Sequence, residues 1–126
     1  MIVLDTSTLL FYLFEPEDLS LTAAATIDRA DQLIISAISI WEIALKVKKA
    51  KLSIPLSVVE MVQLLQRTKK MRFRSVDVEI WLENVSLEWH HKDPADRTIV
   101  ATARLLACPL VTSDQEIKTF YHQSIW

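Results

Sequence analysis

The sequence predicts an α/β fold in which helices cover both faces of a parallel sheet. Short apolar runs alternate along the chain with longer segments whose apolar residues recur at helical spacing. Strands separated by helices pair in parallel through right-handed crossovers, which place helices on both faces. The chain has 126 residues, of which 51% are hydrophobic and 24% charged, as expected for one globular domain over residues 1–126.

The chain begins with two strand and helix pairs. Met1–Leu4 is a short apolar run, and apolar residues at helical density follow over Thr8–Phe14. Ser20–Ala30 is rich in alanine, which favours a helix. Leu33–Ile35 is again short and apolar, and we expect it to form the second strand.

The middle of the chain contains two amphipathic helices and a third strand. Ser39 is expected to open the first helix, in which four apolar residues share a face: Ile40, Ile43, Ala44 and Val47. Ser57–Arg67 alternates apolar and polar residues at helical spacing and starts with a Ser-x-x-Glu capping box. Phe73–Val76 is expected as the third strand.

The last part predicts three more helices and two strands. Val78–Trp89 has helical periodicity, and a helix starts at Pro94 whose later part, Ile99–Ala107, is apolar nearly all round, as in a central helix. The remaining elements are short: a strand at Leu110 and Val111, a helix over Gln115–Tyr121, and an edge strand over Ser124–Trp126.

Composition excludes several classes of protein. Glycine is absent, so the glycine-rich phosphate loops of ATPases and dinucleotide-binding enzymes are excluded. Cys108 is the only cysteine, which excludes an internal disulfide and favours a buried core thiol. No apolar stretch approaches the roughly 18 residues of a membrane span, and an acid at Asp5 stands where a signal peptide carries base. We therefore expect a cytoplasmic protein without a membrane partner.

Carboxylates stand at four of the predicted helix starts: Asp5, Glu42, Asp96 and Asp114. Asp5 and Asp114 come directly after predicted strands. Ligands of parallel α/β sheets bind outside the carboxyl ends of the strands, so these acids are expected at one end of the sheet.

Helix capping explains each acid taken singly. Asp5 is placed to cap the first helix, and Asp93 before Pro94 is a strong N-cap that leaves Asp96 in the first helical turn. Two further pairs have capping-box spacing: Ser39 with Glu42, and Ser113 with Glu116.

A metal site explains their joint placement. Carboxylates brought together raise one another's pKa and oppose folding unless a cation joins them. Hard oxygen ligands favour Mg²⁺ or Mn²⁺, and a carboxylate cluster without His or Cys neighbours argues against zinc. Two such ions about 4 Å apart can activate a water and stabilise the leaving oxygen of a phosphodiester.

Four sequence blocks occur in a characteristic order: Val3-Leu4-Asp5-Thr6-Ser7, Trp41-Glu42-Ile43, His91-Lys92-Asp93-Pro94-Ala95-Asp96-Arg97 and Leu110-Val111-Thr112-Ser113-Asp114. Over essentially the whole chain this order resembles the PIN domain, most closely the toxin nucleases of VapBC toxin–antitoxin pairs. The first block alone is weak, whereas the third followed by the fourth is specific.

The resemblance implies a single PIN domain with a three-layer α/β/α fold and a short, mainly parallel central sheet. It also implies an Mg²⁺- or Mn²⁺-dependent endoribonuclease that acts as a toxin, hydrolysing RNA with metal-activated water. Its acids map onto Asp5, Glu42, Asp96 and Asp114, as catalytic residues and metal ligands, and Asp93 matches an additional acid of some members. Family toxins usually dimerise and are silenced by an antitoxin whose C-terminal segment covers the site.

Several other residues have two explanations each. The hydroxyls beside the acids either hold the carboxylates or serve turns and caps: Thr6, Ser7, Thr112 and Ser113. His91 is expected to order its loop, although its pKa range suits proton transfer. Two basic groups either contact RNA or form solvated faces: Lys46, Lys48, Lys49 and Lys51, and Lys69, Lys70, Arg72 and Arg74. Trp41 and Trp81 lie on apolar faces, which predicts core or interface positions.

Four functions follow for testing. The first is the toxin ribonuclease, and the second is a PIN-fold module that binds RNA or a protein without cleaving. Intact acids argue against the second. A metal-dependent phosphatase beginning at Asp5 is disfavoured, because such enzymes generally carry a second acid where Ser7 stands. A housekeeping nuclease becomes the alternative if no antitoxin gene neighbours the coding sequence.

Overall fold

The computed structural model describes residues 1–126 and contains one sheet of parallel strands in the order β3-β2-β1-β4-β5. The strands are β1 (Ile2–Leu4), β2 (Leu33–Ser36), β3 (Met71–Arg74), β4 (Leu110–Val111) and β5 (Ser124–Ile125). Every connection between consecutive strands contains a helix. The predicted α/β class, the parallel sheet and the C-terminal edge strand are confirmed.

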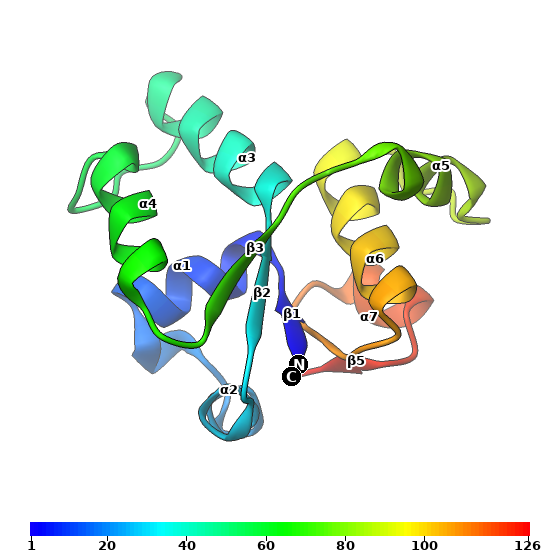
Figure 1. Cartoon of the computed structure of the whole chain (residues 1–126), viewed down its shortest axis with the longest axis horizontal. Coiled ribbons are helices and arrows are strands. Elements are labelled where there is room, and N and C mark those ends of the chain that lie inside the picture. The colour runs from blue at the N-terminus through cyan, green and yellow to red at the C-terminus, as the bar shows by residue number, and fades with distance from the viewer.

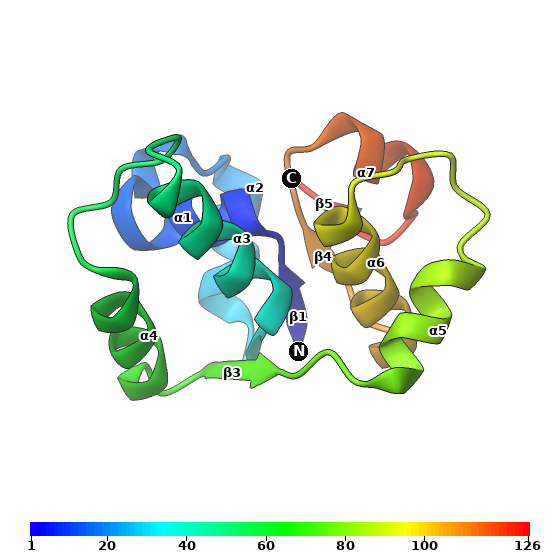
Figure 2. The same ribbon diagram turned by 90° about the horizontal axis from the view of Figure 1, so that it is seen from above.

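Helices form a layer on each side of the sheet (Figures 1 and 2). One layer contains α1 (Thr6–Phe14), α2 (Leu21–Arg29), α3 (Ala37–Lys48) and α4 (Val58–Arg67). The other contains α5 (Val78–Ser86), α6 (Pro94–Leu106) and α7 (Gln115–Phe120). A short 3₁₀ turn, η1 (Pro16–Asp18), joins α1 to α2 and was not expected from the sequence.

The strands are apolar because both faces of the sheet are buried. Ile2 and Leu4 pack with α1 to α4, whereas Val3 between them packs with α5 to α7. Leu33 and Ile35 alternate with Ile34 in the same way. Successive side chains of a strand point to opposite faces, so a strand buried on both sides is a continuous apolar run.

The helix expected to open at Ser39 begins two residues earlier, at Ala37. Ser36, the last residue of β2, caps it by accepting a hydrogen bond from the Ile38 amide. Ser39 is fully buried and accepts a hydrogen bond from the Thr6 hydroxyl at 2.9 Å. The capping box of Ser39 with Glu42 is therefore wrong.

The other helix starts support the capping expectations in part. Asp5 caps α1, which begins at Thr6 rather than Thr8, and Asp93 caps α6 with Pro94 in the first turn. Ser57 with Glu60 forms the expected capping box. The box of Ser113 with Glu116 is wrong, because the Asp114 side chain takes the capping position of α7.

Two further elements have a boundary that differs from the prediction by two residues or more. The third strand covers Met71–Arg74 instead of Phe73–Val76, because four residues pair with β2 from Leu33↔Met71 onward. Arg72 and Arg74 therefore lie on the edge strand β3, where charge opposes pairing with another chain. Helix α5 ends at Ser86, three residues before the predicted Trp89.

Two alanines adopt the left-handed conformation that glycine usually supplies. Ala50 follows α3 with φ 56°, and Ala107 ends α6 with φ 51°. In both turns the next amide bonds back to the helix, from Lys51 to Lys46 and from Cys108 to Ala103. Each costs about 1 kcal/mol in a chain without glycine.

The single cysteine and the length of the helices also bear on the expectations from the sequence. Cys108 is free and buried, as expected for a core thiol. None of the helices has both the length and the apolar character that crossing a membrane requires.

Candidate active site

The acidic residues lie where the strand order reverses. In the sheet, β2 and β3 lie on one side of β1, and β4 and β5 lie on the other side. The connections after β1 and β4 therefore diverge, which is where open α/β sheets bind ligands. In Figure 1 this is the upper end of the sheet, where α3 and α6 begin.

Asp5 is the most enclosed of the four acids, with 4% of its surface exposed. Its Oδ1 accepts a hydrogen bond from the Thr8 amide at 2.8 Å. Its Oδ2 accepts a hydrogen bond from the Thr112 hydroxyl, which comes from the connection after β4. Thr112 thus joins the ends of the two central strands through the carboxylate.

Asp114 belongs to the same network. Its amide donates to the Thr112 hydroxyl oxygen at 3.0 Å, while its side chain accepts from the Glu116 and Ile117 amides. Asp93 and Asp96 approach from α6: the Asp93 carboxylate accepts from the Asp96 amide at 2.9 Å. The backbone of each acid is therefore set by a helix start.

Glu42 enters from the second turn of α3. Its side chain is 15% exposed, and Oε2 lies 3.6 Å from Lys46 Nζ one turn later. This ion pair brings a cation to the acidic site. A partly exposed pair of this spacing contributes little to stability, typically about 0.3–0.5 kcal/mol.

These side chains line a cleft of about 460 Å³. The cleft is lined by seven of the nine predicted site residues: Asp5, Thr6, Ser7, Glu42, Asp93, Asp96 and Asp114. Thr112 does not line the cleft, but its hydroxyl donates a hydrogen bond to Asp5, which does. Ser113 is exposed and does not line the cleft, so its predicted supporting position is not observed.

Burial and mutual repulsion disfavour the charged forms of two carboxyls. Burial raises the pKa of Asp5, against the hydrogen bonds from Thr112 and Thr8, and the charge of Asp114 adds to the rise. Burial also raises the pKa of Asp96 to about 6, and the charges of Asp93 and Asp114 add to it. A cation would relieve both effects, since it favours the carboxylate form.

The chemistry of the donors fits a hard divalent cation, because the cleft offers carboxylate and hydroxyl oxygens and no sulfur. The side chains do not form a ready-made coordination shell. No group of three His, Cys, Asp or Glu residues is close enough as it stands to hold a metal ion. Asp5, Glu42, Asp96 and Asp114 would have to lie closer together than they do here to share one ion.

Sequence reasoning missed three features of the site and its surroundings. Sequence reasoning named Lys46 and Lys51 in a basic group open to RNA contact but did not place them in the cleft, which both line. The spacing of Glu42 and Lys46 by one helical turn was the available signal. Arg97 holds the loop between α5 and α6 by donating to several carbonyl groups. His91 contacts Asp96 directly, with Nε2 2.8 Å from Oδ2.

The second basic group serves the fold. Lys70 donates to three carbonyls at the end of α2: those of Ile27, Asp28 and Ala30. Arg72 donates to the carbonyls of Lys69 and Met71. Trp41 and Trp81 are 54% and 45% exposed, so they lie at the surface and are not core residues.

Comparison with known proteins gives one family. The model of the PIN domain matches residues 2–123. A curated relative, Ribonuclease VapC22 of Mycobacterium tuberculosis, is 30% identical over 122 residues, which cover 96% of this chain and 92% of the relative.

Two solved structures have a similar fold. A structure described as a toxin–antitoxin complex from Klebsiella pneumoniae has a TM-score of 0.70 and 21% identity, covering 100% of this chain and 97% of that chain. FitAcB from Neisseria gonorrhoeae has a TM-score of 0.64 and 21% identity, covering 98% and 93%. At these identities the likeness concerns the fold.

Proposed function

The chain belongs to the PIN-domain family, and on this premise we propose that it is an Mg²⁺- or Mn²⁺-dependent endoribonuclease acting as the toxin of a toxin–antitoxin pair. The observation that carries the proposal is the cleft at the strand ends, in which Asp5, Glu42, Asp96 and Asp114 come together from separate elements. A relative of nearly full coverage is a ribonuclease, which supports RNA as the substrate.

The four carboxylates would hold the metal, and the rest of the site would hold the carboxylates. Thr112 and the Thr8 amide fix both oxygens of Asp5, and helix starts fix the backbones of Asp96 and Asp114. A bound Mg²⁺ or Mn²⁺ would supply the positive charge that activates water and stabilises the leaving oxygen of an RNA phosphodiester.

Lys46 and Lys51 would bind the phosphate backbone of RNA at one wall of the cleft. Both line the cleft, and Lys46 lies 3.6 Å from Glu42. The chain has a formal net charge of −2, so it offers no general attraction for nucleic acid. Lysines at the site and metal charge would therefore supply the attraction locally.

The direct test is RNA cleavage by the purified protein with Mn²⁺, with Mg²⁺ and in chelator. We expect cleavage with either metal and none in chelator. No metal-dependent cleavage of any RNA would remove the enzyme proposal. RNA binding without cleavage would support the alternative, a non-cleaving PIN-fold module for RNA or a protein.

Metal is expected to raise the melting temperature of the protein. An ion that binds only the folded site stabilises it by about 2.7 kcal/mol when its concentration is 100 times the dissociation constant. Relief of repulsion among the carboxylates adds to the same effect. Thermal unfolding in millimolar Mn²⁺ and in chelator measures the shift, and identical melting temperatures would contradict a metal site.

An antitoxin that covers the cleft would also bind in the groove beside it. A groove of about 330 Å³ between α1 and residues 52–55 shares Ser7, Leu10 and Leu52 with the cleft. Five of its nine lining residues are hydrophobic. A partner segment with an apolar part in the groove and a basic residue at the carboxylates would fit both.

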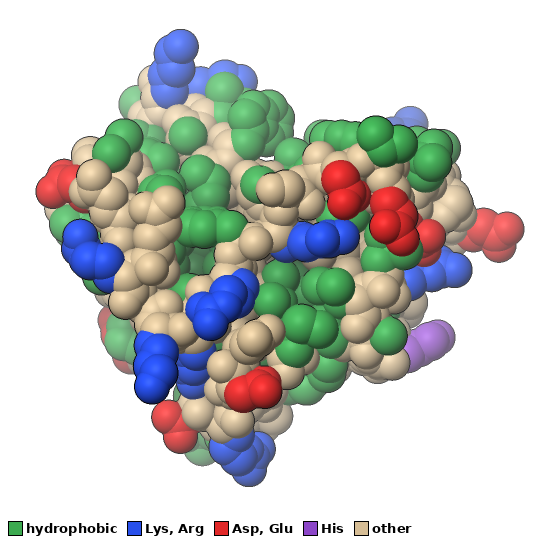
Figure 3. Space-filling model, in the orientation of Figure 1, with side chains coloured by type: hydrophobic (Ala, Val, Ile, Leu, Met, Phe, Trp, Pro, Cys, Tyr) green, Lys and Arg blue, Asp and Glu red, His purple; other side chains and the backbone are tan.

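We also propose a homodimer formed through α5. Four large apolar residues of this helix are exposed: Val78, Trp81, Leu82 and Val85. Figure 3 shows hydrophobic side chains over α5 and over the start of α3, along the upper edge of the molecule. A contiguous apolar face suits a second copy, because both subunits of a two-fold dimer present the same patch.

Light scattering at micromolar concentration is expected to give twice the mass of one chain. Leu82→Glu, at a residue 68% exposed on α5, should give monomers, because two charges would be buried in the interface. Leu21→Glu, at a residue 91% exposed on α2, is the matched control and should leave the dimer intact. A wild-type monomer would reject this proposal.

The predicted cytoplasmic location stays a prediction.

A further inference from the structure

The loop between α5 and α6 is irregular, yet its backbone is held along its length by Arg97 of α6. Nη2 donates to the carbonyls of Asn84 at 2.6 Å and Leu87 at 3.0 Å. Nη1 donates to those of Trp89 at 2.6 Å and His91 at 3.1 Å, and Nε to the Asn84 side chain at 3.3 Å. One planar guanidinium thus fixes the end of α5 and the loop relative to α6.

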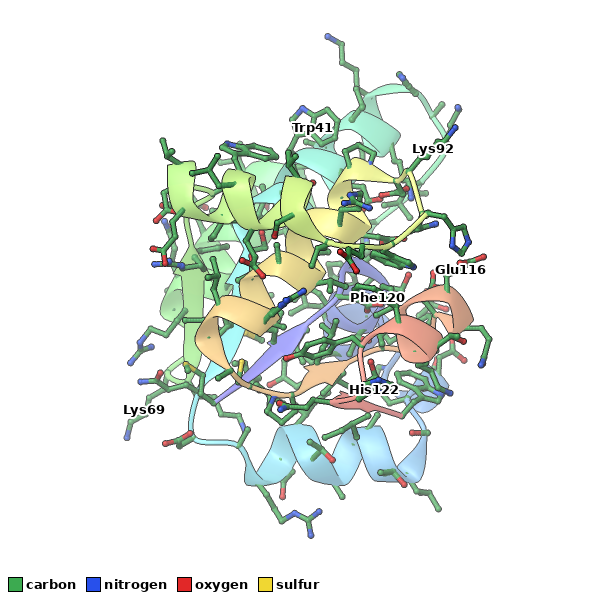
Figure 4. All side chains as sticks on the ribbon, turned by 90° about the vertical axis from the view of Figure 1, so that its right-hand side faces the viewer. Trp41, Lys69, Lys92, Glu116, Phe120 and His122 are labelled. Atoms are coloured by element: carbon green, nitrogen blue, oxygen red, sulfur yellow. The ribbon has the colours of Figure 1, made fainter.

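The ring of His91 is fixed from a second direction. Trp89 stacks on Phe120 of α7, with centroids 4.8 Å apart and an angle of 9°. The His91 ring lies against Trp89 at 4.8 Å and 38°. Figure 4 shows Phe120 between this loop and α7, with Lys92 at the outer side of the loop.

The result of both restraints is the contact of His91 with Asp96. Nε2 of the ring lies 2.8 Å from Oδ2 of the carboxylate. Because a carboxylate oxygen accepts, we assign the hydrogen to Nε2, which donates. The side chains are 23% and 22% exposed, which limits competition from water. No protein group donates to the other carboxylate oxygen, Oδ1, and Asp96 lines the cleft.

We propose that His91 is a positioning residue, which fixes the Asp96 carboxylate by one oxygen and leaves the other available to a divalent cation in the cleft. This inference rests on the proposed function, since it gives Asp96 the place of a metal ligand. A ligating carboxylate that is held by a hydrogen bond is already oriented for the ion. Loss of such partners typically lowers metal affinity by about 10- to 100-fold.

Two substitutions separate the hydrogen bond from the stacking contact. His91→Phe keeps a ring for Trp89 and donates nothing to Asp96. His91→Gln loses the ring but carries an amide nitrogen at a reach similar to Nε2. His90→Phe is the matched control, because this neighbouring side chain is 86% exposed and its Nε2 lies 3.7 Å from Glu116 Oε2 rather than beside Asp96.

The measurements are the dissociation constant for Mn²⁺, by titration of metal-free protein, and the melting temperature in chelator. We expect His91→Phe to weaken Mn²⁺ binding about ten-fold or more, and His91→Gln to stay within about three-fold of wild type. His90→Phe should bind as wild type does. The melting temperatures in chelator should agree, since a positioning role concerns the ion rather than the fold.

If His91→Phe bound Mn²⁺ with wild-type affinity, the inference would be overturned. Equal losses of Mn²⁺ affinity in the Phe and Gln variants would also overturn it. A matching fall of melting temperature in both variants would assign His91 to packing and also overturn it. Wild-type protein that binds Mn²⁺ with the expected pattern but cleaves no RNA would remove the ribonuclease and keep the positioning role. Absence of Mn²⁺ binding to wild type would overturn both.

Discussion

Replacing Asp5, Asp96 or Asp114 with Asn, one at a time, is expected to lower RNA cleavage about 100-fold or more. The neutral amide is a poor ligand for a hard cation and does not balance its charge. A metal contributes several kcal/mol of transition-state stabilisation, and each 1.36 kcal/mol or so corresponds to a factor of ten in rate.

The fold is expected to survive these changes, because Asn caps a helix about as well as Asp. The carboxylates of Asp5 and Asp114 accept from backbone amides of α1 and α7, and an Asn oxygen can accept the same bonds. Asp96 does not cap its helix, since Asp93 does. Loss of activity without loss of structure would therefore separate metal binding from capping.

Stability without metal should hold or rise, and the change at Asp96 should depend on pH. The folded pKa of this carboxyl is about 6 against an ordinary value of 3.8. Between these values the folded protein keeps a proton that the unfolded chain has lost, so the free energy of unfolding falls as the pH rises. The Asp96→Asn variant has no such carboxyl and does not lose stability in this way. The difference between its free energy of unfolding and that of wild type should therefore grow up to about pH 6 and then stay constant.

Two measurements on each variant decide the matter: RNA cleavage with Mn²⁺, and the melting temperature in chelator at several pH values. Glu88→Gln is a suitable control, because Glu88 is an exposed acid outside the cleft. Full activity in all three Asn variants would refute the site.

Arg97→Ala is expected to destabilise the protein by about 3 kcal/mol or more, which corresponds to a fall of roughly 10 °C in melting temperature. Its guanidinium donates five hydrogen bonds. Three of these go to Asn84 and Leu87, which are buried residues. Without Arg97 their two carbonyls would keep only a backbone amide donor each, and the Asn84 side-chain oxygen would lose its donor without gaining full access to water.

Arg104→Ala is the matched control for Arg97→Ala. Arg104 also lies on α6, two turns later, and also reaches α5, through an ion pair of 2.9 Å with Glu83. Its side chain is 54% exposed, so the pair should contribute less than about 1 kcal/mol. Denaturant unfolding of both variants measures the difference in the free energy of unfolding. Equal decreases in the two variants would show that the carbonyl contacts of Arg97 contribute no more to stability than the exposed ion pair of Arg104.

The position of Arg97 also explains a boundary that periodicity misplaced. The helical pattern of α5 continues to Trp89, but the helix ends at Ser86. The carbonyls of Asn84 and Leu87 accept from Arg97, and they also accept from the amides of Leu87 and Trp89 in bonds that do not have α-helical spacing. A contact from another helix has overridden the local preference.

The sequence by itself determined the order of strands and helices, the positions of Asp5, Asp96 and Asp114 at helix starts, and the caps at Asp5, Ser57 and Asp93. Glu42, also expected at a helix start, lies in the second turn of α3. These features depend on periodicity and on hydrogen bonds within a few residues, so a local pattern contains the information. The rule that ligands bind at the carboxyl ends of parallel strands then brought Asp5 and Asp114 to the same end of the sheet.

Only the tertiary structure decided the features that depend on residues far apart in the chain. Thr112 bonds Asp5 across 107 positions, and Lys70 bonds the end of α2 across 40 to 43 positions. The register of β2 with β3 moved the third strand by two residues. Such contacts are selected by which buried donors and acceptors can satisfy one another after the sheet has formed, and no local pattern records that choice.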